Sequence, residues 1–175
     1  WYEENIVNNN LESYIVDSGF CNDRSLNSGT GIDVSTDTYY KGWSRFHNNA
    51  PSLLCLNSSN DLFTVDNTMG NQALTYPIGL ITTDELMLSG AKYGNLNSLT
   101  YVFSAVNYWT MTPIWFNGAH ALVGAIYNDG SLNGPFVDDY YPELGSSAIR
   151  PVINLRADIT ITAGDGTIDS PYVIS

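Results

Sequence analysis

Aromatic, amide and imidazole side chains fall together in the segment 113–120. They are Trp115, Phe116, Asn117 and His120. Aromatic rings beside groups that form hydrogen bonds suit the binding of sugars or peptides, because the ring buries apolar area while the polar group fixes orientation. We expect this segment to be a loop, and loops carry binding residues more often than the scaffold does. Hairpin closure and local packing are the alternative interpretation.

A second segment, 138–147, combines carboxylates with aromatic rings. Closely spaced carboxylate oxygens can ligate calcium, and tyrosines add contact surface for a ligand. The residues concerned are Asp138, Asp139, Tyr140, Tyr141 and Glu143. We favour solvated acids over a calcium site, and we expect the two tyrosines to contact the same ligand as the first segment.

The sequence gives little support for catalysis. His47 and His120 are the two histidines of the chain, too few for a metal site built on three imidazoles. The Gly-x-Ser-x-Gly elbow, the Gly-x-Gly-x-x-Gly fingerprint and the phosphate loop are absent. A Ser–His–Asp triad stays open, because its members meet in space and not in sequence. We expect no enzymatic activity, no cofactor and no metal ion.

Composition excludes several classes of partner. The chain has 18 acidic and 6 basic residues, a net charge of −12, and no two basic residues are adjacent. This argues against nucleic acid, whose phosphates need clustered Lys and Arg, and against an anionic membrane surface. No apolar run reaches the 18 residues of a membrane span. Few lysines with many Asn, Thr and Tyr favour an extracellular protein. The chain opens at Trp1 without Met, so we expect any secretion signal or anchor to lie outside it.

Two cysteines, Cys21 and Cys55, are too few for a structural zinc site. In an oxidising compartment we expect them to pair, and closing this loop would contribute about 4 kcal/mol. Two buried free thiols would be favoured in the cytosol.

The first half of the chain predicts two helices separated by loop. Apolar residues at helical spacing predict a helix over residues 1–16. Residues 19–72 are expected to be mostly loop, with short strands at 53–56 and 62–65. Thr82 with Glu85 three residues later forms a capping box, which predicts a helix that ends at Gly90.

The second half predicts an antiparallel sheet. An Asn-Asp-Gly turn at 128–130 predicts a hairpin. Trp109 is expected in the core, and Pro151 inside a strand indicates an edge or a bulge. The expected strands are 101–103, 108–111 (ended by Pro113), 121–127, 131–137, 149–155, 159–162 and 172–174. Helices early and strands late indicate the α+β class.

Several short motifs occur in an order that resembles the C-type lectin-like fold, and more specifically an uncharacterised domain family of secreted and surface proteins of Gram-positive bacteria. The sequences of this family contain, in order, a strand with an aromatic-Trp pair that ends in Ser/Thr-Pro, a hairpin with Asp-Gly at its turn, an Arg-Pro pair and a C-terminal Gly-Asp-Gly-Thr motif. The matching residues here are 108–113, 129–130, 148–152 and 164–167 with 171–172, preceded by 1–2, 20–25, 76–81 and 83–85. The resemblance covers nearly the whole chain.

The resemblance implies two early helices packed on a twisted antiparallel sheet with long loops. It implies a domain over 1–158 and a C-terminal hairpin tail, 159–175, that belongs to the same domain. Such domains usually begin with a strand pair before the first helix, so we expect those strands to lie outside this chain. The Glu-Pro-Asn, Gln-Pro-Asp and Trp-Asn-Asp signatures of calcium-dependent lectins are absent. Formylglycine-generating oxidases share the broader fold, but Cys21 and Cys55 are far apart in sequence for their copper pair.

Two hypotheses for function follow, together with one structural expectation. The first hypothesis is a non-enzymatic extracellular domain that binds a protein or glycan through the segments 113–120 and 138–147. The second is a structural subunit or head domain of a bacterial surface filament, whose loops contact neighbouring copies. Exposed apolar residues such as Trp115 and Phe136 fit either. Arg150, in an acid-rich chain, is expected in a buried structural ion pair, with anion recognition as the alternative.

Overall fold

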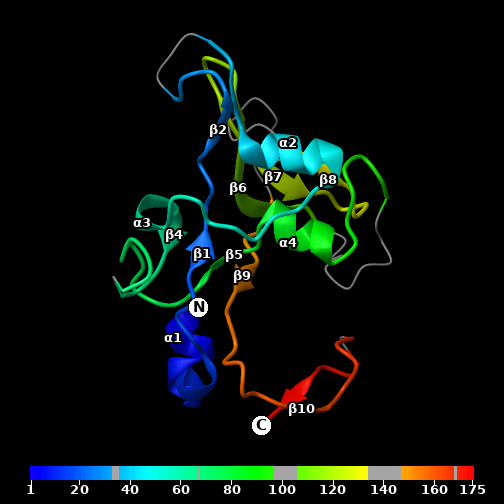
Figure 1. Ribbon diagram of the computed structural model, residues 1–175. Helices are drawn as coiled ribbons and strands as arrows, with labels where there is room; N and C mark the ends of the chain where they lie inside the picture. Colours follow the sequence, from blue (N-terminus) through cyan, green and yellow to red (C-terminus); the bar gives the residue numbers. More distant parts are fainter. Residues whose placement is uncertain (33–35, 67, 97–105, 134–146, 168) are drawn as a thin grey trace.

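A computed structural model shows a mixed α+β protein (Figure 1). The structure describes residues 1–175 except 33–35, 67, 97–105, 134–146 and 168. Five strands form one antiparallel sheet in the order β2-β3-β6-β7-β8. They are β2 (Leu26–Ser28), β3 (Thr38–Tyr40), β6 (Tyr108–Phe116), β7 (Ala121–Ile126) and β8 (Leu132–Asn133). The α+β class predicted from the sequence is confirmed.

β6 is the central strand, and its residues alternate between the buried and the less buried face of the sheet. The predicted end of this strand at Pro113 is wrong, because β6 continues to Phe116. The register between β6 and β7 shifts on both sides of Pro113, which is how a strand accommodates a residue without an N–H. The alternation also places Trp109 on the less buried face, so its neighbour Tyr108 fills the core in its place.

The hairpin predicted at 128–130 is confirmed between β7 and β8. Gly130 has a φ of 79°, a conformation that glycine adopts at no steric cost. The carboxylate of Asp129 accepts a hydrogen bond of 2.8 Å from the backbone N–H of Ser131. The strand expected over 131–137 begins as β8, and its remainder, like the strand expected at 101–103, lies outside the described residues.

The helix predicted over residues 1–16 is wrong in length and continuity. The segment is divided into α1 (Tyr2–Asn5) and two 3₁₀ turns, η1 (Val7–Asn9) and η2 (Glu12–Tyr14). Asn10 has a φ of 56°, and the amide of Asn9 donates to the backbone carbonyls of Glu4 and Asn5. Asparagine side chains that bond to nearby backbone compete with a regular helix, and here they interrupt it.

A helix that the sequence analysis did not predict, α2 (Lys41–Asn48), follows β3 directly. It packs against β6 and against α4 (Thr83–Leu88) (Figure 1). A Cβ on Gly42 would lie 2.6 Å from Cγ2 of Thr112 and 2.8 Å from the carbonyl oxygen of Pro113. Only glycine therefore lets α2 approach β6 so closely.

The core lies where α2 and α4 meet the sheet. Phe46 of α2 and Leu86 of α4 have no exposed surface, and they pack with buried residues of β6, β7 and β8. The full cluster contains Phe46, Leu86, Met87, Ala91, Tyr108, Ile126 and Leu132. The two helices on one antiparallel sheet match the expected layers, but the earlier helix is α2 and not the predicted segment 1–16.

The capping box predicted at the start of α4 is confirmed. The hydroxyl of Thr82 accepts a hydrogen bond of 3.1 Å from the N–H of Glu85, and the carboxylate of Glu85 accepts one of 2.8 Å from the N–H of Thr82. Gly90, just beyond the helix, has a φ of 104°, as expected of a residue that stops a helix.

Three short strand pairs lie outside the main sheet. They are β1 (Phe20–Cys21) with β4 (Leu62–Phe63), β5 (Gly79–Leu80) with β9 (Pro151–Val152), and β10 (Ile161–Ala163) with β11 (Val173–Ile174). α3 (Ser58–Asp61) precedes β4. Pro151 lies on an edge strand, as predicted, and the C-terminal hairpin is confirmed with shorter strands. The strand predicted at 149–155 shortens to β9, that at 62–65 shortens to β4, and residues 53–56 form no strand.

Candidate functional site

Five aromatic and imidazole rings form a continuous series along one side of the molecule, which we call the aromatic row. Its members, in order, are Trp115, Tyr39, Trp43, His47 and Tyr93. The ring centroids of successive members lie 5.5, 5.4, 3.7 and 4.2 Å apart. The first two rings are stacked, with an interplanar angle of 2°.

The aromatic row is assembled from four places in the sequence. Trp115 comes from β6, Tyr39 from β3, Trp43 and His47 from α2, and Tyr93 from the segment after α4. Adjacent antiparallel strands bring Trp115 opposite Tyr39 in register. Spacing by one helical turn brings Trp43 next to His47.

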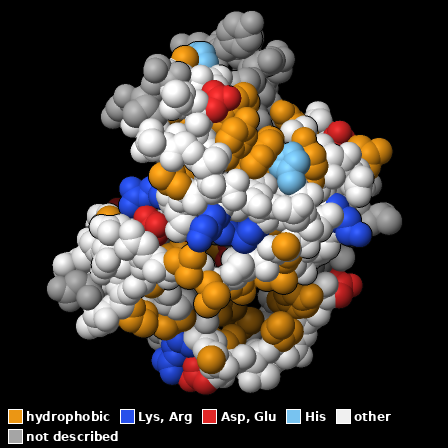
Figure 2. Space-filling model, turned by 45° about the horizontal axis from the view of Figure 1, so that its top comes forward, with side chains coloured by type: hydrophobic (Ala, Val, Ile, Leu, Met, Phe, Trp, Pro, Cys, Tyr) orange, Lys and Arg blue, Asp and Glu red, His pale blue; other side chains and the backbone are white. Residues whose placement is uncertain are grey.

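Exposure increases along the aromatic row. Trp115, Tyr39 and Trp43 are half-buried, whereas His47 is exposed and Tyr93 is 38% exposed. Figure 2 shows hydrophobic side chains on both sides of a histidine on this face. Beneath the exposed end, the fully buried Phe46 contacts Tyr93, with ring centroids 4.6 Å apart. The rings are thus anchored to the core and still reach the surface.

The structure divides the binding residues predicted in the segment 113–120. Trp115 joins the aromatic row, but it lies in a strand and is half-buried, so its predicted exposure and loop position are wrong. Phe116 also lies in β6 and is only 8% exposed. The side-chain oxygen of Asn117 accepts hydrogen bonds from the N–H groups of Ala119 and His120, at 3.1 and 2.7 Å. Asn117 therefore shapes the turn between β6 and β7.

Residues 138–146 of the other predicted binding segment, 138–147, lie outside the described residues. This applies to Tyr140 and Tyr141 and to the three acids considered for calcium, Asp138, Asp139 and Glu143, as well as to Phe136. Among the residues that the structure describes, no group of three or more His, Cys, Asp or Glu side chains is placed to hold a metal ion.

Arg150 lies over the ring of Tyr108, with its guanidinium carbon 5.3 Å from the ring centroid. A guanidinium at this distance from a ring face makes a cation–π contact. Tyr108 is buried in the core, so the contact ties the segment before β9 to the sheet. The ion pair expected for Arg150 stays a prediction.

The predicted disulfide is present between Cys21, at the end of β1, and Cys55. The two residues are 34 positions apart in sequence. The bond fastens the irregular segment 49–57 to the body of the molecule. Three leucines on this segment are nevertheless exposed: Leu53, Leu54 and Leu56.

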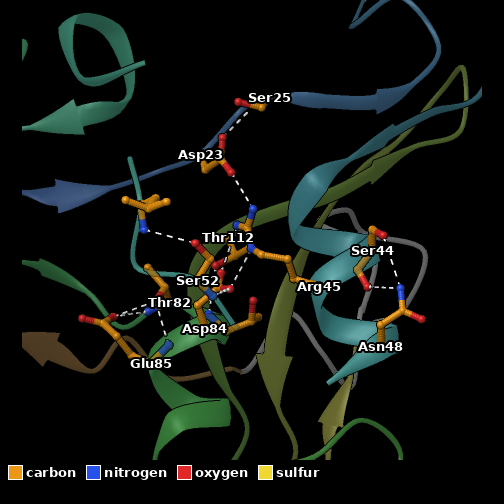
Figure 3. A network of polar contacts seen from close by, with 12 residues as sticks. Asp23, Ser25, Ser44, Arg45, Asn48, Ser52, Thr82, Asp84, Glu85 and Thr112 are labelled. Carbon is orange, nitrogen blue, oxygen red and sulfur yellow. Dashed lines mark hydrogen bonds and ion pairs between the residues drawn. The ribbon is translucent and has the colours of Figure 1, made fainter. Parts of the chain in front are cut away.

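A buried ion-pair network that the sequence analysis did not identify centres on Arg45 of α2 (Figure 3). Its Nε and Nη2 donate to the two carboxylate oxygens of Asp84, at 2.7 and 3.0 Å. Its Nη1 donates to Asp23 at 2.7 Å. The side chains of Asp23 and Asp84 are each 5% exposed, and that of Arg45 is 15% exposed. The backbone N–H groups of Ser25 and Ser52 donate to the same two carboxylates.

These contacts change the pKa of two groups. Burial alone raises the pKa of the Asp23 carboxyl, but hydrogen bonds from Ser25 and Arg45 outweigh burial, and the pKa lies below its ordinary value. Burial lowers the pKa of the Arg45 guanidinium, but hydrogen bonds to Asp84 and Asp23 outweigh it and raise the pKa. Asp23 and Arg45 are therefore both charged at neutral pH.

A cavity of about 320 Å³ opens beside this network. It lies between the start of α4, the strand β1 and the disulfide-anchored segment 52–55. Charged and apolar side chains share its lining, which includes Asp23, Arg45, Leu54, Leu62, Glu85 and Met111. Figure 2 shows Lys and Arg side chains in the middle of this face, next to a group of hydrophobic side chains.

The sequence analysis missed the Arg45 network and the cavity beside it, because both depend on contacts between distant segments of the chain. The sequence did offer a signal for α2, namely the helical spacing of Trp43 and Phe46 followed by Asn49 and Pro51, residue types that often end a helix. Once α2 is placed, Arg45 faces the start of α4. Nothing local in the sequence identifies Asp23 as its partner.

The chain matches no protein-family model, no curated protein and no solved structure. Among the described residues, no helix has the length and apolar character needed to cross a membrane.

Proposed function

We propose that this protein is a non-enzymatic extracellular domain with a C-type lectin-like fold, and that it binds a neutral glycan on the aromatic row. The observation that carries this proposal is the continuity of the row. Trp115, Tyr39, Trp43, His47 and Tyr93 meet ring to ring across three elements and the segment after α4.

Aromatic rings suit sugars because the apolar C–H face of a pyranose packs on a ring while its hydroxyls stay in contact with water or polar groups. The exposed end of the row offers both a ring surface for the C–H face of a sugar and polar atoms for its hydroxyls. His47 and Tyr93 present rings with polar atoms. Asn48 directly follows His47 in the chain and Asn95 lies two residues after Tyr93, and both residues are exposed. The amide nitrogen of Asn48 donates to the carbonyl oxygen of Ser44 at 2.8 Å.

Charge favours a neutral glycan over an acidic one. The whole chain carries a net charge of −12, and its field repels sulfated or carboxylated sugars. The two tryptophans of the row have no ionisable group. Affinity would therefore come from ring contacts and hydrogen bonds, and binding should vary little with salt.

The placement outside the cell is supported by the disulfide and by composition. Disulfides persist in oxidising compartments and are rare in the cytosol. Cys21 and Cys55 are paired, and the chain is poor in lysine. Two helices packed on one antiparallel sheet, with long irregular segments, are compatible with the proposed lectin-like fold.

A glycan array with purified protein tests the proposal, followed by calorimetry with the neutral oligosaccharides that bind. The decisive variant is Tyr93→Ala, which removes the exposed end of the row and should weaken binding about tenfold or more. Tyr93→Phe keeps the ring and should retain most of the affinity. Tyr172→Ala is the matched control, because Tyr172 is 55% exposed in the C-terminal hairpin.

Equal affinity of Tyr93→Ala and Tyr172→Ala would remove the aromatic row from the binding site. The alternative function, a structural subunit of a surface filament, predicts a different result. The protein would bind no glycan and would form oligomers that grow with concentration, which analytical ultracentrifugation would detect.

A further inference from the structure

The cavity beside Arg45 lies apart from the aromatic row and has a different chemical character. Its lining carries three carboxylates, those of Asp23, Asp84 and Glu85, against the single guanidinium of Arg45. Asp23 and Asp84 are almost fully buried. The excess of negative charge in a confined space favours a cationic group and disfavours an anion.

The guanidinium of Arg45 is itself directed at protein carboxylates and not at a ligand. Its Nε, Nη1 and Nη2 atoms each donate to Asp23 or Asp84 (Figure 3). An incoming anion would have to displace these charge-assisted bonds. Arg45 therefore holds Asp23 and Asp84 in place, and these two carboxylates form the acidic floor of the cavity.

Glu85 provides the acceptor for a cationic ligand. Its Oε2 accepts the N–H and the hydroxyl of Thr82 in the capping box. Among the described residues, no donor lies on its Oε1, although Glu85 lines the cavity and is partly exposed. A carboxylate fixed by one oxygen, with the other oxygen available, is preorganised to receive an ammonium group.

The walls and rim of the cavity are apolar. Phe20, Leu62 and Met111 contribute to the walls. Leu53 and Leu54 form the rim and are 66% and 70% exposed. The disulfide at Cys55 holds this rim beside the cavity. Exposed neighbouring leucines at the mouth of a cavity are typical of a contact surface for another protein.

We propose that this cavity receives a lysine side chain from a basic protein partner. The four methylenes of lysine match the apolar walls, and its ammonium group reaches the acidic floor, as amphipathic side chains do at interfaces. Apolar residues beside that lysine pack on Leu53 and Leu54. The negative charge of the whole chain favours a basic partner over an acidic one.

A second copy of this chain is a poor occupant. It has 6 basic residues against 18 acidic ones, and Lys41 and Lys92 are its two lysines. Two copies therefore repel each other. A partner with a positive net charge meets no such repulsion.

The probe for this site is the peptide acetyl-Leu-Lys-Leu-amide, compared with acetyl-Leu-norleucine-Leu-amide, which has the same shape without the ammonium group. Binding is followed through the methyl NMR signals of Leu54 and Met111. We expect the lysine peptide to shift these signals with an affinity that falls as salt is raised. We expect the norleucine peptide to bind more weakly by about tenfold or more.

Two variants test the assignment. Glu85→Gln removes the charge but keeps the capping box, because glutamine also serves at that position, and it should weaken the lysine peptide about tenfold. Leu54→Ser should weaken both peptides. Leu88→Ser is the matched control, because Leu88 is 58% exposed and does not line the cavity, and it should leave both affinities unchanged.

Equal binding of the two peptides, or an unchanged affinity in Glu85→Gln, would overturn the proposal. So would self-association that Leu54→Ser abolishes, since the rim would then bind a second copy. The test is independent of the proposed glycan function, because Tyr93→Ala should leave the lysine peptide unaffected.

Discussion

Arg45 of α2 and Asp84 of α4 are joined by two parallel hydrogen bonds, Nε to Oδ1 at 2.7 Å and Nη2 to Oδ2 at 3.0 Å. This bidentate geometry is the strong form of an arginine–carboxylate pair. It connects the two helices that cover the sheet, on the side where the cavity opens. The same guanidinium also holds Asp23, so one residue links three segments of the chain.

Replacing Arg45 should therefore be costly. Arg45→Ala leaves two buried carboxylates without their counter-charge, and we expect a loss of about 3 kcal/mol in the free energy of unfolding. Denaturation by urea measures this loss. Arg156→Ala is the matched control, because the Arg156–Asp158 pair is exposed and such pairs contribute little. Similar losses in the two variants would contradict a structural role for the Arg45 network.

The network also predicts how stability depends on pH. The pKa of Asp23 is lowered in the folded protein, so the folded state favours the charged form. The charged Asp23 carboxylate therefore contributes to the free energy of unfolding above the pKa of an unfolded aspartate, about 3.9. This contribution is lost as the pH falls through the lower pKa of the folded protein. Asp23→Asn should thus be less stable than the native protein at pH 7, with the difference shrinking toward about pH 3.

Urea denaturation of both proteins at several pH values between about 7 and 3 checks this expectation. A difference between native protein and Asp23→Asn that stays constant over the whole range would mean that the charge of Asp23 does not stabilise the fold.

The disulfide should stabilise the fold and hold the rim of the cavity. Replacing both cysteines, as C21A/C55A, should lower the free energy of unfolding by about 4 kcal/mol, because the open chain gains entropy when unfolded. It should also broaden the NMR signals of Leu53 and Leu54. Treatment of the native protein with a reductant is the control and should reproduce both effects. An unchanged stability would indicate that other contacts of the segment hold it.

The approach of α4 to the sheet depends on one glycine. A Cβ on Gly124 of β7 would lie 2.2 Å from Cγ2 of Thr83, so Gly124→Ala should destabilise the protein by about 1–3 kcal/mol through overpacking. Thr83→Ser removes the methyl group that clashes, and the double variant should recover much of the loss. A double variant in which the two effects simply add would show that the clash is not the cause.

The features that the sequence predicted well are those with a local cause. The capping box of Thr82 and Glu85 needs residues only three positions apart. The hairpin turn at Gly130 needs a positive φ that a few residue types allow. The disulfide follows from the number of cysteines together with the expected compartment.

The features that the sequence missed are fixed by tertiary contacts. α2 contains Gly42, Ser44 and Asn48, which are poor helix formers in isolation, and its stability comes from packing Phe46 into the core. β6 passes through Pro113 because its register with β7 shifts on both sides of that residue. The aromatic row and the Arg45 network both depend on where α2 lies, so neither was accessible without that helix.

The central claim is that a neutral glycan binds on the aromatic row, and the indole N–H signals of the four tryptophans test it most directly. Neutral oligosaccharides of glucose, mannose, galactose and N-acetylglucosamine are titrated into ¹⁵N-labelled protein. We predict that the signals of Trp43 and Trp115 shift and saturate together with at least one of these sugars. Trp1, which is 55% exposed at the start of the chain, should not respond. Shifts of Trp1 or Trp109 without those of the row, or no shift with any sugar, would contradict the proposed function.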